Sequence, residues 1–260
     1  MNFACQQEAV AQLQDMAAHN VHSILLEGVA GAGKTYLARQ YARLLEVSDF
    51  QVVDPSVGTL RSTIDDCMTL QSPVVLCIEN LDLGVAAASY TILKLLEEPM
   101  SHVYIVVTCR NMKRVPDTII SRSNVVTTSP PSRIDIDAFA NDRTPARFQE
   151  LKNSPIWKCA TSFSFAAKIL DMTNEQVSFY PSLASMFSKR DTVSNMVWKL
   201  GHYPDNTEVP TEIAINYIIF STQSKHIRMA GIQCMRDLSA GRVAAHAAIA
   251  RFVFECKYCE

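Results

Sequence analysis

The sequence predicts an α/β protein in which a parallel sheet with crossover helices is followed by a helical region. Within the first 130 residues, short apolar runs rich in β-branched residues alternate with segments whose apolar residues recur at helical spacing. The runs are nearly continuous rather than alternating, which is typical of strands covered on both faces. Beyond Ser129-Pro130-Pro131 the helical pattern continues and few strand signals remain.

Five apolar runs are expected to form the strands of the sheet. They are Ser23–Leu26, Gln51–Val53, Pro73–Ile78, Val103–Val107 and Asn124–Thr127. The segments between them place apolar residues on one helix face, as Leu37, Tyr41 and Leu44 do after the first run. Because strand and helix alternate, we expect a parallel sheet whose strands are joined by right-handed crossover helices.

The chain divides into an α/β domain over residues 1–131 and two helical domains, over residues 132–183 and 184–260. The break at the first boundary is sharp, whereas the second lies in a helical region with softer signals. The stretches 211–220 and 244–254 have more apolar residues than a tail of this size should need for itself. We therefore expect the last domain to mediate assembly, with a self-contained helical bundle as the alternative.

Composition excludes several classes of protein. The 260 residues are 48% hydrophobic and 19% charged, which is ordinary for a globular chain and excludes disordered and fibrous classes. The 24 basic and 26 acidic residues give a net charge of −2, so any contact with DNA must come from a local patch or from partner subunits. We expect a cytoplasmic protein without a membrane segment, because the start lacks a secretory signal and no apolar run approaches 18 residues.

Eight cysteines are scattered along the chain, several of them inside apolar stretches. In a cytosolic protein free thiols are the default state, and a buried thiol behaves as a small hydrophobic group. Cys256 and Cys259 form a CxxC pair without a second pair to complete four zinc ligands, so its role stays open.

A glycine-rich loop follows the first expected strand at once. Residues 28–35 read GVAGAGKT and match the phosphate-loop pattern GxxxxGK[ST]. Glycines let successive N–H groups turn toward phosphate oxygens, and the following helix adds its positive N-terminal dipole. Lys34 is expected to neutralise the outer phosphates and Thr35 to bind Mg²⁺, the alternative being a glycine-rich turn without a ligand. The residues expected to bind the nucleotide are Gly28, Val29, Ala30, Gly31, Ala32, Gly33, Lys34, Thr35 and Tyr36.

An acidic residue stands at the end of the third expected strand. A phosphate-loop ATPase needs a carboxylate here for Mg²⁺ and usually a neighbouring glutamate that polarises the attacking water. Glu79 can hold the metal and is our second candidate ligand, but Asn80 cannot act as a base. Asp82 could substitute as the base, although we expect it to leave the strand in another direction.

The segments that follow Glu79 resemble a known family. They are Ile92-Leu93-Lys94-Leu95-Leu96-Glu97-Glu98-Pro99, the strand 103–107 and Ile119-Ile120-Ser121-Arg122-Ser123. These segments resemble the clamp-loader branch of the AAA+ ATPases, whose bacterial members carry LLKxLEEP, a following strand and a serine-arginine-cysteine motif. Delta-prime and gamma-tau type subunits of bacterial DNA polymerase III are the most similar. The resemblance covers residues 5–131 in specific motifs and the helical remainder in architecture only.

The resemblance implies a P-loop AAA+ domain over residues 1–131, with a five-stranded parallel sheet in the order 5-1-4-3-2. It implies a small helical lid domain over 132–183 and a collar-like assembly domain over 184–260. Thr108 would be the polar nucleotide sensor. Arg122 would be a trans arginine finger, which stabilises charge on the phosphoryl group transferred at a neighbouring subunit's site. The alternative for Arg122 is a surface arginine that interacts with the last carbonyls of a helix.

Two departures from the family pattern bear on ATP hydrolysis. Family members that hydrolyse ATP well resemble one another in carrying an Asp-Glu pair at this strand end. This chain has Glu79-Asn80 there, a pair that resembles the altered pair of the stator subunits more closely. In the lid, Phe165 stands where the family places an arginine that touches the phosphates. We therefore expect ATP and Mg²⁺ to bind and hydrolysis at this site to be slow.

Taken together, the motifs favour a subunit of a sliding-clamp loader in DNA replication. Its expected partners are other loader subunits in a hetero-oligomer, the sliding clamp, and primer-template DNA reached through the assembled complex. The alternatives are another AAA+ ATPase of DNA metabolism, such as a helicase loader or branch-migration motor, and a non-hydrolysing scaffold with an inherited phosphate loop.

Overall fold

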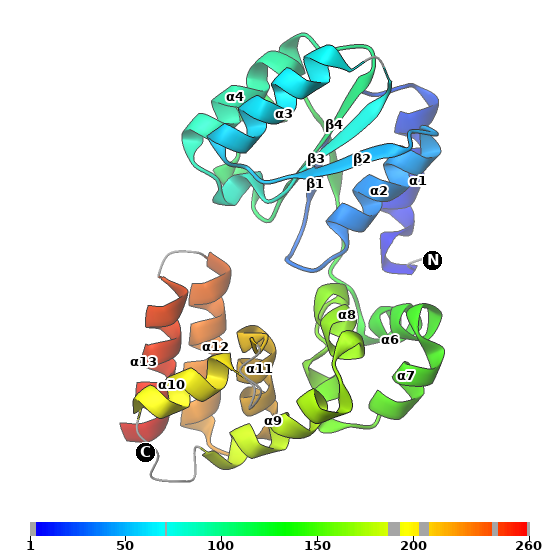
Figure 1. The fold of residues 1–260 in the computed structure, drawn as a ribbon. Coiled ribbons are helices and arrows are strands. Elements are labelled where there is room, and N and C mark those ends of the chain that lie inside the picture. The colour runs from blue at the N-terminus through cyan, green and yellow to red at the C-terminus, as the bar shows by residue number, and fades with distance from the viewer. Residues whose placement is uncertain (1–3, 71, 187–192, 203–207, 241–243, 259–260) are drawn as a thin grey trace. The chain divides into compact units, whose positions relative to one another are not determined.

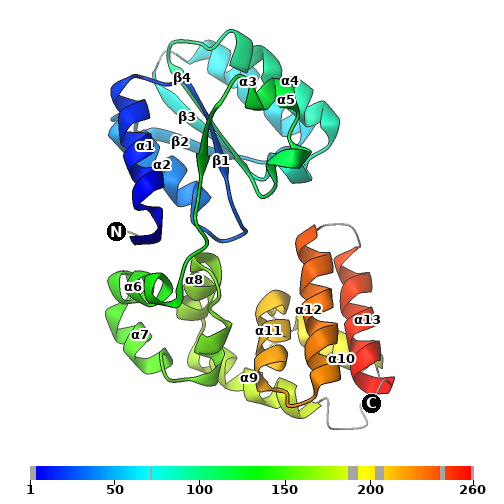
Figure 2. The same ribbon diagram turned by 180° about the vertical axis from the view of Figure 1, so that it is seen from behind.

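The protein is represented by a computed structural model that describes residues 4–70, 72–186, 193–202, 208–240 and 244–258. The chain separates into two compact units, Met1–Asp135 and Ile136–Glu260. The first unit contains a sheet with helices on both faces, and the second is built of helices (Figures 1 and 2). The three-part division proposed from the sequence stays a prediction.

The first unit contains a five-stranded sheet in which every neighbouring pair of strands is parallel. The strand order is β2-β3-β4-β1-β5, which confirms the predicted order 5-1-4-3-2 when it is followed from the other edge. The strands are β1 (Ser23–Glu27), β2 (Asp49–Val53), β3 (Val74–Ile78), β4 (Val103–Cys109) and β5 (Asn124–Thr127).

Helices cover both faces of this sheet. Helices α1 and α2 lie on one face, and α3 and α4 lie on the other (Figure 1). The helices of the unit are α1 (Gln7–Ala18), α2 (Lys34–Leu44), α3 (Val57–Thr69), α4 (Ala86–Glu97) and α5 (Asp117–Ile120), with 3₁₀ turns η1 (Ala4–Gln6), η2 (Leu81–Leu83) and η3 (Met112–Arg114).

The alternation of side chains along β1 explains why its sequence is apolar throughout. Ile24 and Leu26 belong to the core under α1 and α2, and Leu25 belongs to the core under α3 and α4. All three are fully buried. Because burial of one such side chain contributes about 1.5–3 kcal/mol, both faces of the strand are fixed between helices. The tip of β1 is thus a rigid place from which to start a binding loop.

The second unit is entirely helical in its described part. Its central element is α11, in which every residue from Ile213 to Ile219 is buried. Helices α9 and α12 and the turn η4 pack against it. The elements are α6 (Arg133–Arg143), which starts at the boundary, α7 (Pro145–Leu151), η4 (Pro155–Cys159), α8 (Phe163–Asp171), α9 (Asn174–Met186), α10 (Val193–Gly201), α11 (Thr211–Ser221), α12 (Lys225–Ala240) and α13 (Ala245–Tyr258).

The apolar stretches that motivated the assembly prediction are largely used inside this unit. The apolar residues of α11 from Ile213 to Ile219 are buried, as are Ala248, Phe252 and Val253 of α13. Among the described residues of α10 to α13, the large apolar side chains left exposed are Trp198, Phe220, Met229 and Phe254. Assembly through residues 184–260 therefore stays a prediction, and these exposed side chains are the place to test it.

None of the described helices combines the length and hydropathy needed to cross a bilayer. The seven cysteines among the described residues are free thiols. Burial raises the pKa of Cys77 and of Cys256 to about 12, so these thiols stay protonated at neutral pH. Cys259, the second member of the CxxC pair, lies outside the described residues.

Gly231 of α12 lies at a close contact with helices α11 and α13. A Cβ atom there would lie 2.5 Å from Ile219 Cγ1 on α11 and 3.4 Å from Phe252 on α13. We expect Gly231→Ala to lower the free energy of unfolding by about 1–3 kcal/mol, because the added methyl group overpacks a tight contact. Denaturant unfolding measures this change.

Gly201→Ala is the matched control, because nothing lies within 4 Å of a Cβ at this position in α10. We expect its stability to stay within about 0.5 kcal/mol of the wild type. Equal stability of Gly231→Ala and the wild type would show that α11 and α12 are not in close contact.

Candidate nucleotide-binding site

The loop between β1 and α2 adopts a conformation that needs its glycines. Gly31 has φ 74° and Gly33 has φ 92°, values that side-chain-bearing residues rarely adopt. Gly33 is the N-cap of α2, and its carbonyl accepts the first helical hydrogen bond from Leu37 at 2.9 Å. The loop therefore ends with the free N–H groups of a helix start, where an anion binds favourably.

Gly28 ties this loop to the neighbouring strands. Its N–H donates to the carbonyl of Cys109 at the end of β4, at 3.2 Å. A Cβ atom at Gly28 would lie 1.9 Å from the Thr128 hydroxyl oxygen, just beyond β5. Glycine is required here because the backbone passes between two other chain segments.

Lys34 lies inside the loop. Its side chain is 7% exposed, and Nζ donates to the carbonyls of Gly28 at 2.7 Å and Val29 at 2.9 Å. Burial, and next the positive charge of Arg110, lower the pKa of the Lys34 amine. The carbonyl oxygens that accept from Nζ carry no net charge, so the positive charge of Lys34 can also attract a phosphate anion.

Thr35 and Glu79, the two predicted ligands of Mg²⁺, are brought together. The Thr35 hydroxyl, in the first turn of α2, donates a hydrogen bond to Glu79 Oε1, at the end of β3. A hydroxyl and a carboxylate are hard oxygen ligands, and Mg²⁺ commonly takes only one or two protein ligands together with water and phosphate. The pair therefore fits this metal, and no larger metal-binding group of His, Cys, Asp and Glu occurs in the described chain.

The end of β3 is fixed by β4. Asn80 has the left-handed φ of 50°, and its N–H donates to the Thr108 hydroxyl at 2.9 Å. Thr108 is 2% exposed. The predicted sensor residue therefore holds the strand end that carries Glu79.

Arg110 lies directly after β4, beside the end of β3, and the sequence analysis did not single it out. Its N–H donates to Asp82 Oδ1 at 3.0 Å, and its side-chain Nε donates to Asn80 Oδ1 at 3.2 Å. The signal available in the sequence was a charged residue directly after a buried parallel strand. Asp82 is buried and accepts this backbone hydrogen bond, so its carboxylate supports the β4 end rather than facing water as a base.

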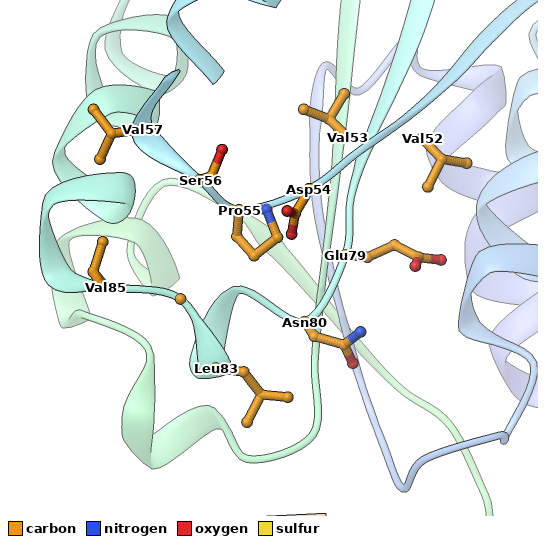
Figure 3. Close-up of a pocket in the computed structure, with 11 residues that line it drawn as sticks. Val52, Val53, Asp54, Pro55, Ser56, Val57, Glu79, Asn80, Leu83 and Val85 are labelled. Carbon is orange, nitrogen blue, oxygen red and sulfur yellow. The ribbon is translucent and has the colours of Figure 1, made fainter. Parts of the chain in front are cut away.

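An open pocket lies beside the end of β3. Its volume is about 710 Å³, and its walls come from the ends of β2 and β3 and the turns that follow them. Figure 3 shows Glu79 and Asn80 pointing to the same side, away from Val57 and Val85. Solvent therefore has access to the strand end where Mg²⁺ and its water would lie.

Gln6 holds the loop from the amino-terminal side. It is 1% exposed, and its Nε2 donates to the carbonyls of Ala32 at 3.2 Å and Ser129 at 2.7 Å. Ser129 in turn donates its N–H to Gln6 Oε1. One side chain thus joins the phosphate loop to the chain after β5.

Arg122 lies at the amino ends of the strands, whereas the loop lies at their carboxyl ends. It precedes β5, and the adjacent Ser123 hydroxyl is 3.0 Å from that of Ser23, the first residue of β1. The loop begins after Glu27, the last residue of β1. A strand of this length separates Glu27 from Ser23 by about 13 Å. Arg122 is 37% exposed, forms an ion pair with Glu97 at 2.9 Å and donates to the Thr118 carbonyl. It is therefore not part of the phosphate site of its own subunit.

The remaining predicted positions differ in their exposure to solvent. Val29 is 49% exposed and Ala32 is fully buried, and Tyr36 is half-buried in the first turn of α2. In the second unit, Phe165 lies in the first turn of α8, where its N–H donates to the N-cap hydroxyl of Ser162 at 3.2 Å. The helix start of the predicted lid is therefore present, with phenylalanine in place of arginine.

The fold is similar to that of AAA+ ATPases, and the loop after β1 carries the phosphate-loop pattern. Residues 56–132 match the family model described as DNA polymerase III, delta subunit. The matched segment contains β3 with Glu79 directly after it, the LLEEP segment and Arg122. The comparison with curated proteins gives no match.

Solved structures of the same fold come from Thermotoga maritima. A DNA polymerase III gamma subunit-related protein is 12% identical with a TM-score of 0.58, over 95% of this chain and 98% of that chain. The RuvB Holliday junction branch migration motor is 13% identical with a TM-score of 0.53, over 94% of this chain and 80% of that one. The fold and the matched segment fit a clamp-loader-type AAA+ ATPase, which confirms the resemblance.

Proposed function

We propose that this protein is a subunit of a sliding-clamp loader in DNA replication. It binds ATP and Mg²⁺ at the loop 28–35 and assembles with other loader subunits to open a clamp and place it on primer-template DNA. The family match over residues 56–132 supports this function over that of other AAA+ proteins, because the LLEEP and SRS segments lie within it. The net charge of −2 agrees with DNA contacts that are made by the assembled complex.

One observation carries the proposal. The phosphate loop and Arg122 lie at opposite edges of the same sheet, so a single subunit cannot bring both to one nucleotide. A ring or partial ring solves this problem, because the Arg122 edge of one subunit then meets the loop edge of the next. Arg122 is in this role a catalytic residue of the neighbour's site.

The subunit's own site is proposed to bind ATP and to turn it over slowly. Lys34, Thr35 and Glu79 hold the phosphates and the metal, which supplies electrostatic stabilisation of the phosphates. Asn80 can orient water but cannot take its proton, and Phe165 removes a phosphate contact from the lid. Losing stabilising groups of this kind typically lowers the rate of hydrolysis by a hundredfold or more.

Two other functions compete with this proposal. A branch-migration motor shares the fold, but the match over residues 56–132 favours the polymerase family. A scaffold that binds ATP without hydrolysis is favoured by Asn80 and Phe165. Mixing the protein with loader subunits, clamp and primed DNA separates the three, because only a loader subunit increases ATP turnover and clamp loading together.

Lys34→Ala should abolish ATP binding, since the buried ammonium is the main positive charge of the loop. We expect Kd for Mg–ATP to rise at least about 100-fold, which isothermal titration calorimetry measures. Single-turnover hydrolysis by the wild-type subunit alone should be slow. Fast hydrolysis that Lys34→Ala removes would contradict the assignment of Asn80 and would show a full motor subunit.

Arg122→Ala should lower the ATPase rate of the assembled loader about 10³-fold at the neighbouring site, the lower end of the range for arginine fingers. The subunit's own ATP affinity should change less than about threefold, because Arg122 lies at the far edge of the sheet. Glu97→Gln is the matched control for loss of the ion pair. A variant that loses its own ATP binding while the loader's rate stays normal would overturn the finger assignment.

A further inference from the structure

We propose that Arg110 is a nucleotide-binding residue that contacts the terminal phosphate of ATP bound in the same subunit, and that Asn80 positions it. The inference rests on the proposed function only in requiring that the loop 28–35 binds ATP. It assigns a role to a residue outside the phosphate-loop motif and gives a reason for asparagine at the end of β3.

The backbone places Arg110 beside the phosphate loop. Cys109, the residue before it, accepts a hydrogen bond from the Gly28 N–H at 3.2 Å. The Gly28 carbonyl in turn accepts from Lys34 Nζ at 2.7 Å. Two hydrogen bonds thus connect the backbone at Arg110 to the ammonium group that is expected to bind the phosphates. The charge of Arg110 is also among those that act on Lys34.

Hydrogen bonds from the end of β3 fix both the backbone and the side chain of Arg110. The Asp82 carboxylate accepts from the backbone N–H at 3.0 Å, and the Asn80 amide oxygen accepts from Nε at 3.2 Å. The guanidinium is planar and donates in a fork that matches phosphate oxygens, so fixing Nε sets the plane in which the other donors lie. Asn80 is itself held by Thr108, which makes the arrangement rigid.

An amide oxygen differs from a carboxylate in this position. Asn80 carries no net charge and therefore orients the guanidinium without cancelling its charge. A glutamate at position 80 would form an ion pair with Arg110, and the positive charge offered to a phosphate would be reduced. Asparagine at this position therefore suits a site that retains ATP, whereas glutamate suits one that activates water.

The same arrangement compensates for the arginine that the lid lacks. Phe165 occupies the position where the family places an arginine that contacts the phosphates. Arg110 supplies a guanidinium from the sheet instead. Because a terminal phosphate is present in ATP and absent in ADP, this contact should distinguish the two nucleotides.

The test compares the affinities of the full-length protein for Mg–ATP and Mg–ADP by isothermal titration calorimetry. We expect Arg110→Ala to weaken ATP binding roughly 10- to 100-fold and ADP binding less than about threefold, as for loss of a charge-assisted hydrogen bond. Lys113→Ala is the matched control, because Lys113 is an exposed cation on the same segment. It removes the same charge and should leave both affinities unchanged.

Two more variants test positioning. Arg110→Lys keeps the charge but lacks the Nε that Asn80 holds, so its ATP affinity should lie between those of the wild type and Arg110→Ala. Asn80→Ala should weaken ATP binding less than Arg110→Ala does. The double variant should be no weaker than Arg110→Ala alone, because Asn80 acts through Arg110. Additive losses would overturn the positioning role.

Each remaining outcome has a defined meaning. Equal losses for ATP and ADP, together with a lower Tm, would give Arg110 a structural role and overturn the inference. ATP binding that Lys34→Ala abolishes and Arg110→Ala leaves intact would overturn the inference alone. Absence of ATP binding by the wild type would overturn the proposed nucleotide site as well. If Arg110→Ala does not fold, Arg110→Lys and Asn80→Ala decide the question by the same ATP-to-ADP comparison.

Discussion

The parallel register of β1, β3 and β4 is the constraint on which the rest of the site depends. In a parallel sheet all carboxyl ends meet at one edge, so residues that follow different strands are brought together whatever their separation in sequence. The loop after β1, Glu79 and Asn80 after β3, and Arg110 after β4 all meet at this edge. The amino ends meet at the other edge, where Arg122 precedes β5. The phosphate loop and Arg122 thus lie at opposite ends of the strands, which is the arrangement that the proposed function requires.

Much of this could be predicted from the sequence because the signals are local. The pattern GVAGAGKT predicts backbone conformation, charge and metal ligand within eight consecutive residues, and in the structure Lys34 bonds to the loop carbonyls and Thr35 to Glu79. The strand order followed from the resemblance together with the handedness of crossovers, which leaves few other topologies. Glu79 was found because a carboxylate after an apolar strand is unusual.

The residues that the sequence did not indicate act over long separations and carry no local pattern. Gln6 contacts Ser129, and Arg110 contacts Asn80, through hydrogen bonds whose partners only the folded sheet brings together. The apolar residues of α11 illustrate a signal that allows two interpretations. A helix that is apolar on all sides is typical of the centre of a bundle as well as of an interface, and the sequence does not distinguish the two. The structure buries Ile213–Ile219 within the second unit.

The two departures from the family pattern become one feature when Arg110 is considered with them. Considered alone, Asn80 indicates the loss of the residue that would activate water. Considered alone, Phe165 indicates the loss of a residue that would contact the phosphates. A glutamate at position 80 would compete with phosphate for the Arg110 guanidinium, which would weaken the proposed contact with ATP. Under the proposed function, the loss of the base and the contact from Arg110 would act in the same direction. Both would favour a subunit that keeps its bound ATP rather than one that hydrolyses it.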